Sequence, residues 1–166
     1  MWLLKALFGG KNRSAPPASS SAAEPKARPA KANARRGSVV TNLKTFPSNM
    51  VGESNYQDAL AKVAGGYQRD SQAFEIPAVI ALDPANSYDP NAVKVEIKGV
   101  TVGYLPAAEA KRIGEMMRQQ GIEEADLKAQ IRGGWRTNQH DQGNFGVKLR
   151  LPRRGWVDFG VGAKEQ

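Results

Sequence analysis

The chain has 166 residues, a hydrophobic content of 40% and a formal net charge of +8, which together suit one domain with flexible basic extensions. It contains no cysteine, so disulfides, cysteine-based zinc sites and thiol nucleophiles are excluded. The excess of basic residues favours polyanionic partners, either nucleic acid or an anionic membrane.

The N-terminal part of the sequence is predicted to lie outside the folded domain. Met1–Phe8 (MWLLKALF) is apolar but too short for a signal peptide or a membrane span, and we expect either an inert or partner-docking end or a weak membrane or oligomer contact. Residues 9–48 are predicted as a disordered linker, because Gly9–Gly37 has no aromatic and no β-branched residue. Residues 1–37 contain eight Lys or Arg and one acidic residue, which makes this arm either a solvated spacer or an electrostatic tether for DNA.

The folded domain is predicted over residues 49–151 and begins with a short strand at Met50–Glu53. A helix follows, with Ser54 as its N-cap and Gln57 completing a capping box. Gly65 and Gly66 mark the end of this helix. The apolar stretch Phe74–Leu82 then has the composition of a long strand.

The middle of the domain is predicted as a hairpin. Asp83–Asn91 (DPANSYDPN) is rich in turn-forming residues, and Ala92–Ile97 alternates between apolar and charged side chains. Lys98 and Gly99 are expected to turn the chain into a second strand, Val100–Leu105.

A second helix is predicted from Pro106 to about Gln120, followed by strands at Asp126–Arg132 and Phe145–Leu151. About five antiparallel strands with two helices indicate a mainly β protein, a small barrel resembling the OB-fold. Residues 152–166 are predicted as a C-terminal tail, from which Trp156, Val157 and Phe159 can pack back on the domain.

The sequence lacks the common catalytic patterns. His140 is the only histidine, and it stands in a polar loop where a solvated role is expected. There is no Walker-type phosphate loop and no dinucleotide-binding glycine motif. We therefore expect a soluble cytoplasmic binding protein that is not an enzyme and has no metal or cofactor.

Two segments carry a family resemblance: Val51–Leu60 (VGESNYQDAL) and Leu82–Leu105 (LDPANSYDPNAVKVEIKGVTVGYL). With a VGxxxY start, a YDPNAV turn and strand, and a following VGYLP, residues 49–151 resemble the HIRAN domain, of the stand-alone bacterial type. The resemblance implies an OB-like barrel that binds single-stranded DNA and holds the free 3′ end in a context of DNA repair or remodelling. It places Tyr88, Asp89 and Tyr104 on the nucleotide pocket.

The chemistry of these residue types agrees with that implication. A carboxylate such as Asp89 accepts a hydrogen bond from a 3′ hydroxyl and repels a 3′ phosphate, which gives end selectivity as a difference between two affinities. Tyr88, Tyr104 and Tyr56 are candidate stacking platforms for bases. Alternatively, Asp89 and Asn91 only cap their own turn, and Tyr104, Tyr56 and Phe145 belong to the core.

One departure from the resemblance concerns phosphate binding. DNA-end-binding relatives have an arginine and an aromatic residue where this sequence has Ser54 and Asn55. Arg132, Arg136, Lys148 and Arg150 are candidates to compensate, with Lys148 and Arg150 on one strand face as a phosphate track or simply a solvated face. The expected partner is single-stranded DNA; RNA, or a protein bound by an adaptor with a basic tethering arm, are the alternatives.

Overall fold

A computed structural model of the chain describes residues 35–161. The expected apolar segment Met1–Phe8, most of the expected linker and the end of the expected tail lie outside the described residues. Within them the fold is mainly β, and its curled sheet is consistent with the predicted OB-like architecture.

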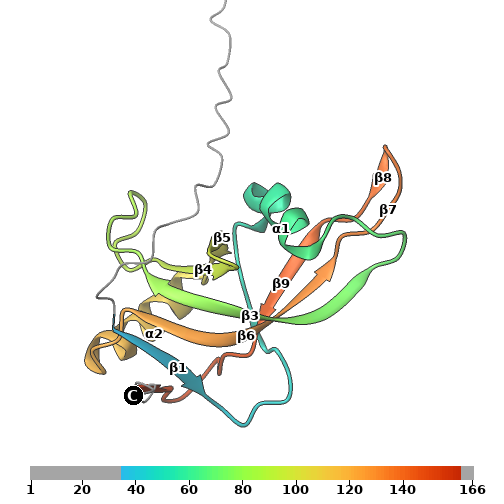
Figure 1. Cartoon of the computed structure of the whole chain (residues 1–166). Coiled ribbons are helices and arrows are strands. Elements are labelled where there is room, and N and C mark those ends of the chain that lie inside the picture. Colours follow the sequence, from blue (N-terminus) through green and yellow to red (C-terminus); the bar gives the residue numbers. More distant parts are fainter. Residues whose placement is uncertain (1–34, 162–166) are drawn as a thin grey trace, which may run out of the picture.

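The elements alternate as predicted between strands and two α-helices (Figure 1). The helical elements are a 3-10 turn η1 (Glu53–Tyr56), α1 (Gln57–Ala64) and α2 (Ala107–Gln119). The strands are β1 (Arg36–Val40), β2 (Ser48–Asn49), β3 (Gln72–Leu82), β4 (Val93–Ile97), β5 (Val100–Tyr104), β6 (Glu124–Gly133), β7 (Arg136–Asn138), β8 (Asp141–Gln142), β9 (Phe145–Leu149) and β10 (Asp158–Val161).

β6 is the central strand of the sheet. It pairs antiparallel with β3 from Gln72 opposite Gly133 to Ala81 opposite Glu124. On its other side, the first residues of β6 pair in parallel with β1, and the last ones pair antiparallel with β9. Because the partner changes along one edge of β6, the sheet curls into a half-barrel rather than lying flat (Figure 1).

The core lies on the inner face of this curl and follows the alternation of the strands. Along β6 every second side chain is buried, whereas those between them are partly or fully exposed. β4 contributes Val93, Val95 and Ile97, as its alternating sequence predicted. Helix α2 contributes Ala110, Ile113 and Met117, also as predicted.

The β4–β5 hairpin turns at the predicted residues. Lys98 and Gly99 both have positive φ, 51° and 77°, which is the geometry of a tight two-residue hairpin turn. In β5, a Cβ on Gly103 would lie 2.7 Å from the carbonyl oxygen of Val51. The glycine therefore allows the Val51 backbone to pair with Tyr104 through hydrogen bonds of 2.8 and 3.0 Å.

The predicted capping box at the first helix is wrong. The helix begins later, at Gln57 after the 3-10 turn, and no side chain caps either segment. The Gln57 amide instead joins η1 to β9: its Nε2 donates to the carbonyls of Glu53 and Phe145, both at 2.9 Å, and its Oε1 accepts from the Phe145 N–H at 2.8 Å. A tertiary contact has replaced the local one.

Smaller differences occur at other element boundaries. The predicted strand at Met50–Glu53 is an isolated bridge at Val51 beside the short β2. Pro106 precedes α2 instead of opening it, since its ψ of 144° is extended. β7 and β8 form a short hairpin inside the expected polar loop.

The sheet extends beyond the predicted domain limits at both ends. β1 lies in the segment expected as linker and β10 in the segment expected as tail, and the two strands pair with each other. Val157 and Phe159 are buried, whereas Trp156 is 61% exposed. The pairing of two distant, short segments supplies the hydrogen bonds that neither could make alone.

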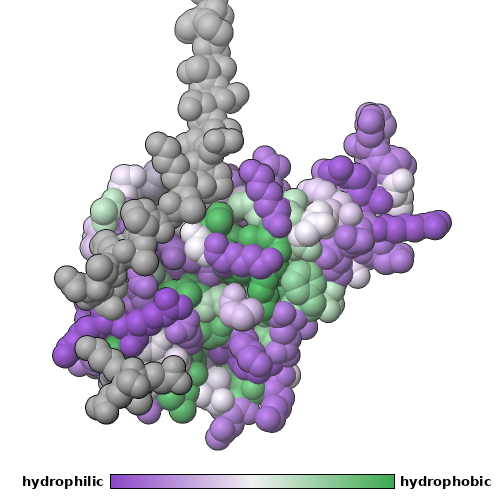
Figure 2. Space-filling model, in the orientation of Figure 1, coloured by the Kyte–Doolittle hydropathy of each residue, from purple (hydrophilic) through white to green (hydrophobic). Residues whose placement is uncertain are grey.

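The β7–β8 hairpin projects from the body of the molecule, and its surface is strongly hydrophilic (Figure 2). Among the residues described, no helix is both long and apolar enough to cross a membrane.

We predict that Gln57→Ala lowers the free energy of unfolding by about 1–3 kcal/mol, because it leaves the backbone N–H and carbonyl of Phe145 without their partner. Chemical denaturation monitored by circular dichroism measures this change. Gln119→Ala, at an exposed position in the last turn of α2, is the matched control and should leave stability nearly unchanged. Equal effects of the two substitutions would contradict the assigned role of Gln57.

Candidate nucleic-acid interface

A groove of about 390 Å³ opens beside the C-terminal end of β5, and we call it the tyrosine groove. Its walls come from four parts of the chain: the turn before α1, the loop between β3 and β4, the end of β5, and the start of α2. The lining residues are Val51, Gly52, Asn55, Tyr56, Asn86, Tyr88, Asp89, Ala92, Tyr104, Leu105, Ala107 and Ala110.

The β3–β4 loop is held in place by its own polar groups. The side-chain oxygen of Asn86 accepts from the backbone N–H groups of Tyr88 at 2.9 Å and Asp89 at 3.2 Å. The Asp89 Oδ1 in turn accepts from the N–H of Asn91 at 2.8 Å. These are the side-chain turns expected of Asn and Asp, and they fix the loop that presents Tyr88 and Asp89 to the groove.

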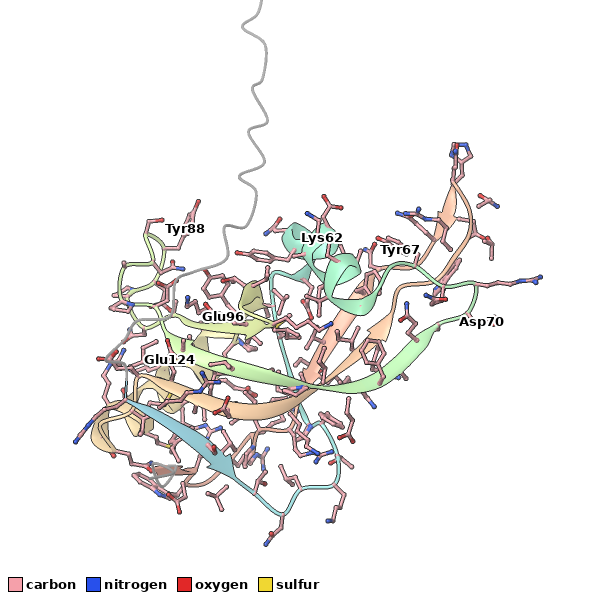
Figure 3. The ribbon with its side chains drawn as sticks, in the orientation of Figure 1. Lys62, Tyr67, Asp70, Tyr88, Glu96 and Glu124 are labelled. Atoms are coloured by element: carbon pink, nitrogen blue, oxygen red, sulfur yellow. The ribbon has the colours of Figure 1, made fainter. Side chains whose placement is uncertain are left out.

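Tyr88 is the most exposed aromatic residue of the site. Its side chain is 96% exposed and points from the loop into solvent (Figure 3). An aromatic side chain gains nothing for folding from such a position, because no apolar surface is removed from water. Tyr88 thus has a free ring face at the rim of the tyrosine groove.

Tyr104 and Tyr56 form the inner part of the groove. Their ring centroids are 6.5 Å apart with an interplanar angle of 50°. The Tyr104 hydroxyl donates a long hydrogen bond of 3.4 Å to the Asp83 carboxylate. Burial, the neighbouring Tyr56 phenol and the Asp83 carboxylate raise the pKa of Tyr104 above its ordinary value, so this hydroxyl stays protonated and keeps its hydrogen bond to Asp83.

The charge at the groove is unusual for a nucleic-acid site. The lining residues include the acidic Asp89 and no Lys or Arg. The N-terminal turn of α2 reaches the groove through Ala107 and Ala110, and no side chain caps it. The free N–H groups of a helix start carry partial positive charge, and here they add to the side-chain amide of Asn55 as hydrogen-bond donors at the groove.

The structure brings together five of the residues singled out from the sequence: Asn55, Tyr56, Tyr88, Asp89 and Tyr104. Of the two alternatives for Tyr56, a stacking platform or core packing, the structure favours the first, because this partly exposed residue lines the groove.

The other candidates lie elsewhere. Ser54 and Asn91 stand next to the groove without lining it. Phe145 is buried in the core against Tyr67, with a centroid distance of 4.9 Å, so it does not cover the pocket.

The candidate phosphate track lies on the outer face of the sheet, away from the lining of the groove. Lys148 in β9 and Arg150 just after its end are both partly exposed, as the alternation predicted, and Arg132 is exposed on β6. Arg150 pairs with Glu75 at 2.7 Å and stacks on Phe46 at 4.6 Å from the ring centroid. Arg136 stacks on Tyr67 at 4.1 Å.

Sequence reasoning missed several residues of the groove, of which Asn86 and the start of α2 matter most. Asn86 lies two residues before Tyr88 in a turn-rich segment, so its side-chain turn was a signal present in the sequence. The contribution of Ala107 and Ala110 had no comparable signal, because it depends on where the helix start lies in three dimensions. Within residues 35–161, no cluster of His, Asp and Glu suited to a metal ion occurs.

Residues 66–129 match the family model of the HIRAN domain. The chain contains a HIRAN domain. The match runs from the end of α1 into β6 and includes Tyr88, Asp89 and Tyr104. Neither the curated proteins nor the solved structures contain a match to this chain.

The HIRAN domain is a nucleic-acid-binding module, which agrees with the expectation drawn from the sequence. Part of the tyrosine groove belongs to the matched residues of this HIRAN domain, whereas Asn55 and Tyr56 lie before them. The module and the groove therefore overlap at the exposed Tyr88 and its neighbour Asp89.

We predict a steep loss of stability at alkaline pH that depends on Tyr104. In the unfolded chain its phenol ionises near pH 10, whereas the raised pKa keeps it neutral in the fold, so its contribution is complete below pH 10 and is lost as the pH rises further. Free energies of unfolding measured from pH 8 to about pH 11 should fall less steeply for Tyr104→Phe than for the wild type. Tyr88→Phe, which removes a phenol that the fold leaves in solvent, is the matched control. Parallel curves for wild type and Tyr104→Phe would refute the assignment.

Proposed function

We propose that this protein binds single-stranded DNA at a free 3′ end in the tyrosine groove. The observation that carries the proposal is the pair Tyr88 and Asp89, a free aromatic face beside a carboxylate on a loop held by its own hydrogen bonds. The HIRAN domain supports nucleic acid as the class of ligand. The geometry of the Tyr88 and Asp89 pair supports recognition of the strand end.

Asp89 supports selectivity for the terminus. One of its oxygens accepts the N–H of Asn91, and an ionised carboxylate has further lone pairs that can accept a hydrogen bond from a 3′ hydroxyl. A 3′ phosphate, or the phosphodiester of an internal nucleotide, would bring negative charge against the carboxylate. The groove lining contains no Lys or Arg that would offset this repulsion.

The tyrosines support binding of bases without sequence preference. Tyr88 offers a ring that is free of protein contacts over nearly its whole surface, and stacking on such a platform contributes about 1–3 kcal/mol per base. Tyr56 and Tyr104 lie deeper, at 50° to each other, and suit the apolar edges of a sugar and base. The Tyr104 hydroxyl donates its proton to Asp83 and keeps lone pairs that can accept a hydrogen bond from the ligand, and the free N–H groups of α2 can face a phosphate oxygen.

In this proposal the protein is a binding module and not an enzyme, and it positions repair or remodelling machinery at DNA ends in the cytoplasm. His140, the single histidine, is exposed near the tip of the β7–β8 hairpin. The β7–β8 hairpin does not line the tyrosine groove, so His140 has no role in the proposed binding site.

The second candidate function is a protein–protein adaptor. The lack of Lys and Arg in the groove lining favours it, because a polyanion gains most of its affinity from such residues. An adaptor would bind a protein after nuclease treatment and would ignore oligonucleotides, so the binding experiments below separate the two functions.

We predict that wild-type protein binds a 5′-labelled oligonucleotide with a 3′ hydroxyl more tightly than the same strand with a 3′ phosphate, and that Asp89→Asn removes most of this preference. Asparagine keeps an oxygen for the Asn91 N–H, so the loop is retained while the charge is lost. Fluorescence anisotropy measures both affinities. Asp58→Asn, an exposed acidic position on α1, is the control for net charge and should keep the preference. A preference that survives in Asp89→Asn would exclude the proposed role of Asp89.

We predict that Tyr88→Ala weakens binding of single-stranded DNA by about 1–3 kcal/mol, whereas Tyr88→Phe keeps most of the affinity because the stacking ring remains. Neither substitution should change the free energy of unfolding, since the side chain is 96% exposed. Isothermal titration calorimetry and thermal denaturation report the two quantities. Equal loss in both variants would mean that the hydroxyl, and not the ring face, makes the contact.

A further inference from the structure

The segment Pro152–Val157, which we call the Arg-Trp loop, is fixed on α2 by side chains of the helix. The Arg112 guanidinium donates to the carbonyl of Gly155 at 2.8 Å and to that of Pro152 at 2.5 Å. Gln120 holds the following residues: its Nε2 donates to the Val157 carbonyl at 2.9 Å, and its Oε1 accepts from the Phe159 N–H at 3.0 Å. The loop is thus held at both ends.

This fixed loop presents an exposed aromatic residue close in sequence to two cations. Trp156 is 61% exposed, and it follows Arg153 and Arg154, which are both exposed as well. Val157, the next residue, is 1% exposed. Val157, and not Trp156, therefore supplies the side chain that packs in the core. Folding therefore leaves a large indole in solvent on a loop that the rest of the structure holds in one shape.

The charges around the Arg-Trp loop favour an anionic partner. Arg112 donates its hydrogen bonds to neutral carbonyls, so its positive charge is not balanced by them. Arg153 faces Glu109 at 3.5 Å, and Arg154 adds a further cation. With the exposed Asp158 included, three arginines stand against two carboxylates, which leaves a small excess of positive charge beside the indole.

The Arg-Trp loop and the tyrosine groove both contact the start of α2, which lies between them. Glu109, the partner of Arg153, is in the first turn of this helix, and Ala107 and Ala110 of the same turn line the groove. A helix with its side chains is about 10–12 Å wide. A stacked strand with about 3.4 Å between nucleotides crosses that width in about three or four nucleotides.

We propose that the Arg-Trp loop is a second contact for the same single strand, with Trp156 stacking on a base and Arg153 and Arg154 facing phosphates a few nucleotides before the 3′ end. This inference rests on the proposed function, because it takes the 3′ end to lie in the tyrosine groove. It supplies the cations that the groove lining lacks. A strand that leaves the groove across the start of α2 meets the loop next.

The test compares two strands with 3′ hydroxyls on the full-length protein by isothermal titration calorimetry: a trinucleotide, which fills the groove alone, and an oligonucleotide of about twelve nucleotides, which reaches the loop. For the longer strand, we expect Trp156→Ala to lose about 5- to 20-fold in affinity, within the range of one stacked base. The double variant Arg153→Ala and Arg154→Ala should make the plot of log affinity against log salt less steep, by about one unit of slope. Trinucleotide affinity should stay unchanged in both variants.

The controls separate stacking from charge and from folding. Trp156→Phe keeps a ring and should retain most of the affinity for the longer strand. Lys44→Ala with Arg69→Ala removes two exposed cations from loops away from α2 and should leave the salt slope nearly unchanged. The basic arm is present in every variant, so its contribution cancels. Thermal denaturation verifies that each variant folds.

Each outcome is informative. Full affinity of Trp156→Ala and of the double arginine variant for the longer strand overturns the inference and leaves the loop as a surface for a protein partner. Equal losses for the trinucleotide and the longer strand also overturn it, because the loop would then act through the groove. If the wild type binds the longer strand but shows no preference for the 3′ hydroxyl, the proposed function fails, while a length-dependent loss in the loop variants would still assign the loop to nucleic acid.

Discussion

The full-length pairing of β3 with β6 is the constraint on which the site depends. Through this ladder and the pairing of β3 with β4 and of β4 with β5, one row of residues runs across the sheet: Glu124 opposite Ala81, Ala81 opposite Lys94, and Lys94 opposite Tyr104. The β3–β4 loop, the end of β5 and the start of α2 therefore meet at one end of the sheet. The tyrosine groove forms where these three parts meet the turn before α1.

Two local features then give the groove its shape. Gly103 lets the Val51 backbone approach β5, which brings the turn containing Asn55 and Tyr56 against Tyr104. Asn86 hydrogen-bonds the backbone on which Tyr88 and Asp89 stand. A ligand that binds a loop already held in this way does not bear the entropic cost of ordering it, so more of the contact free energy appears as affinity.

Prediction from the sequence succeeded where the local rules for strands, turns and helices agree with the tertiary structure. The alternation of β4, the turn at Lys98 and Gly99, and the buried face of α2 were all predicted, because period and turn chemistry are local properties. The HIRAN resemblance also rested on local motifs and is confirmed. Tyr88, Asp89 and Tyr104 were placed in one pocket through that resemblance, and the structure does bring them together.

Prediction failed where partners are distant in sequence. Gln57 had the spacing of a capping box, but its amide finds Phe145, 88 residues away, and such a contact leaves no local pattern. β1 and β10 are short segments that become strands only by pairing with each other and with β6. Alternation showed that Lys148 and Arg150 share a face, but not that this face lies away from the groove lining.

The separation of cations from the tyrosine groove has a physical reason if the groove discriminates between strand ends. Affinity for a polyanion comes mostly from phosphate contacts, which every nucleotide offers equally. Selectivity is instead a difference between two affinities, and here it depends on an uncompensated carboxylate. A Lys or Arg beside Asp89 would pair with that carboxylate and attract the phosphate that it should repel. Cations on the Arg-Trp loop and the outer sheet face can strengthen binding of any strand while leaving the charge of Asp89 free to act at the terminus.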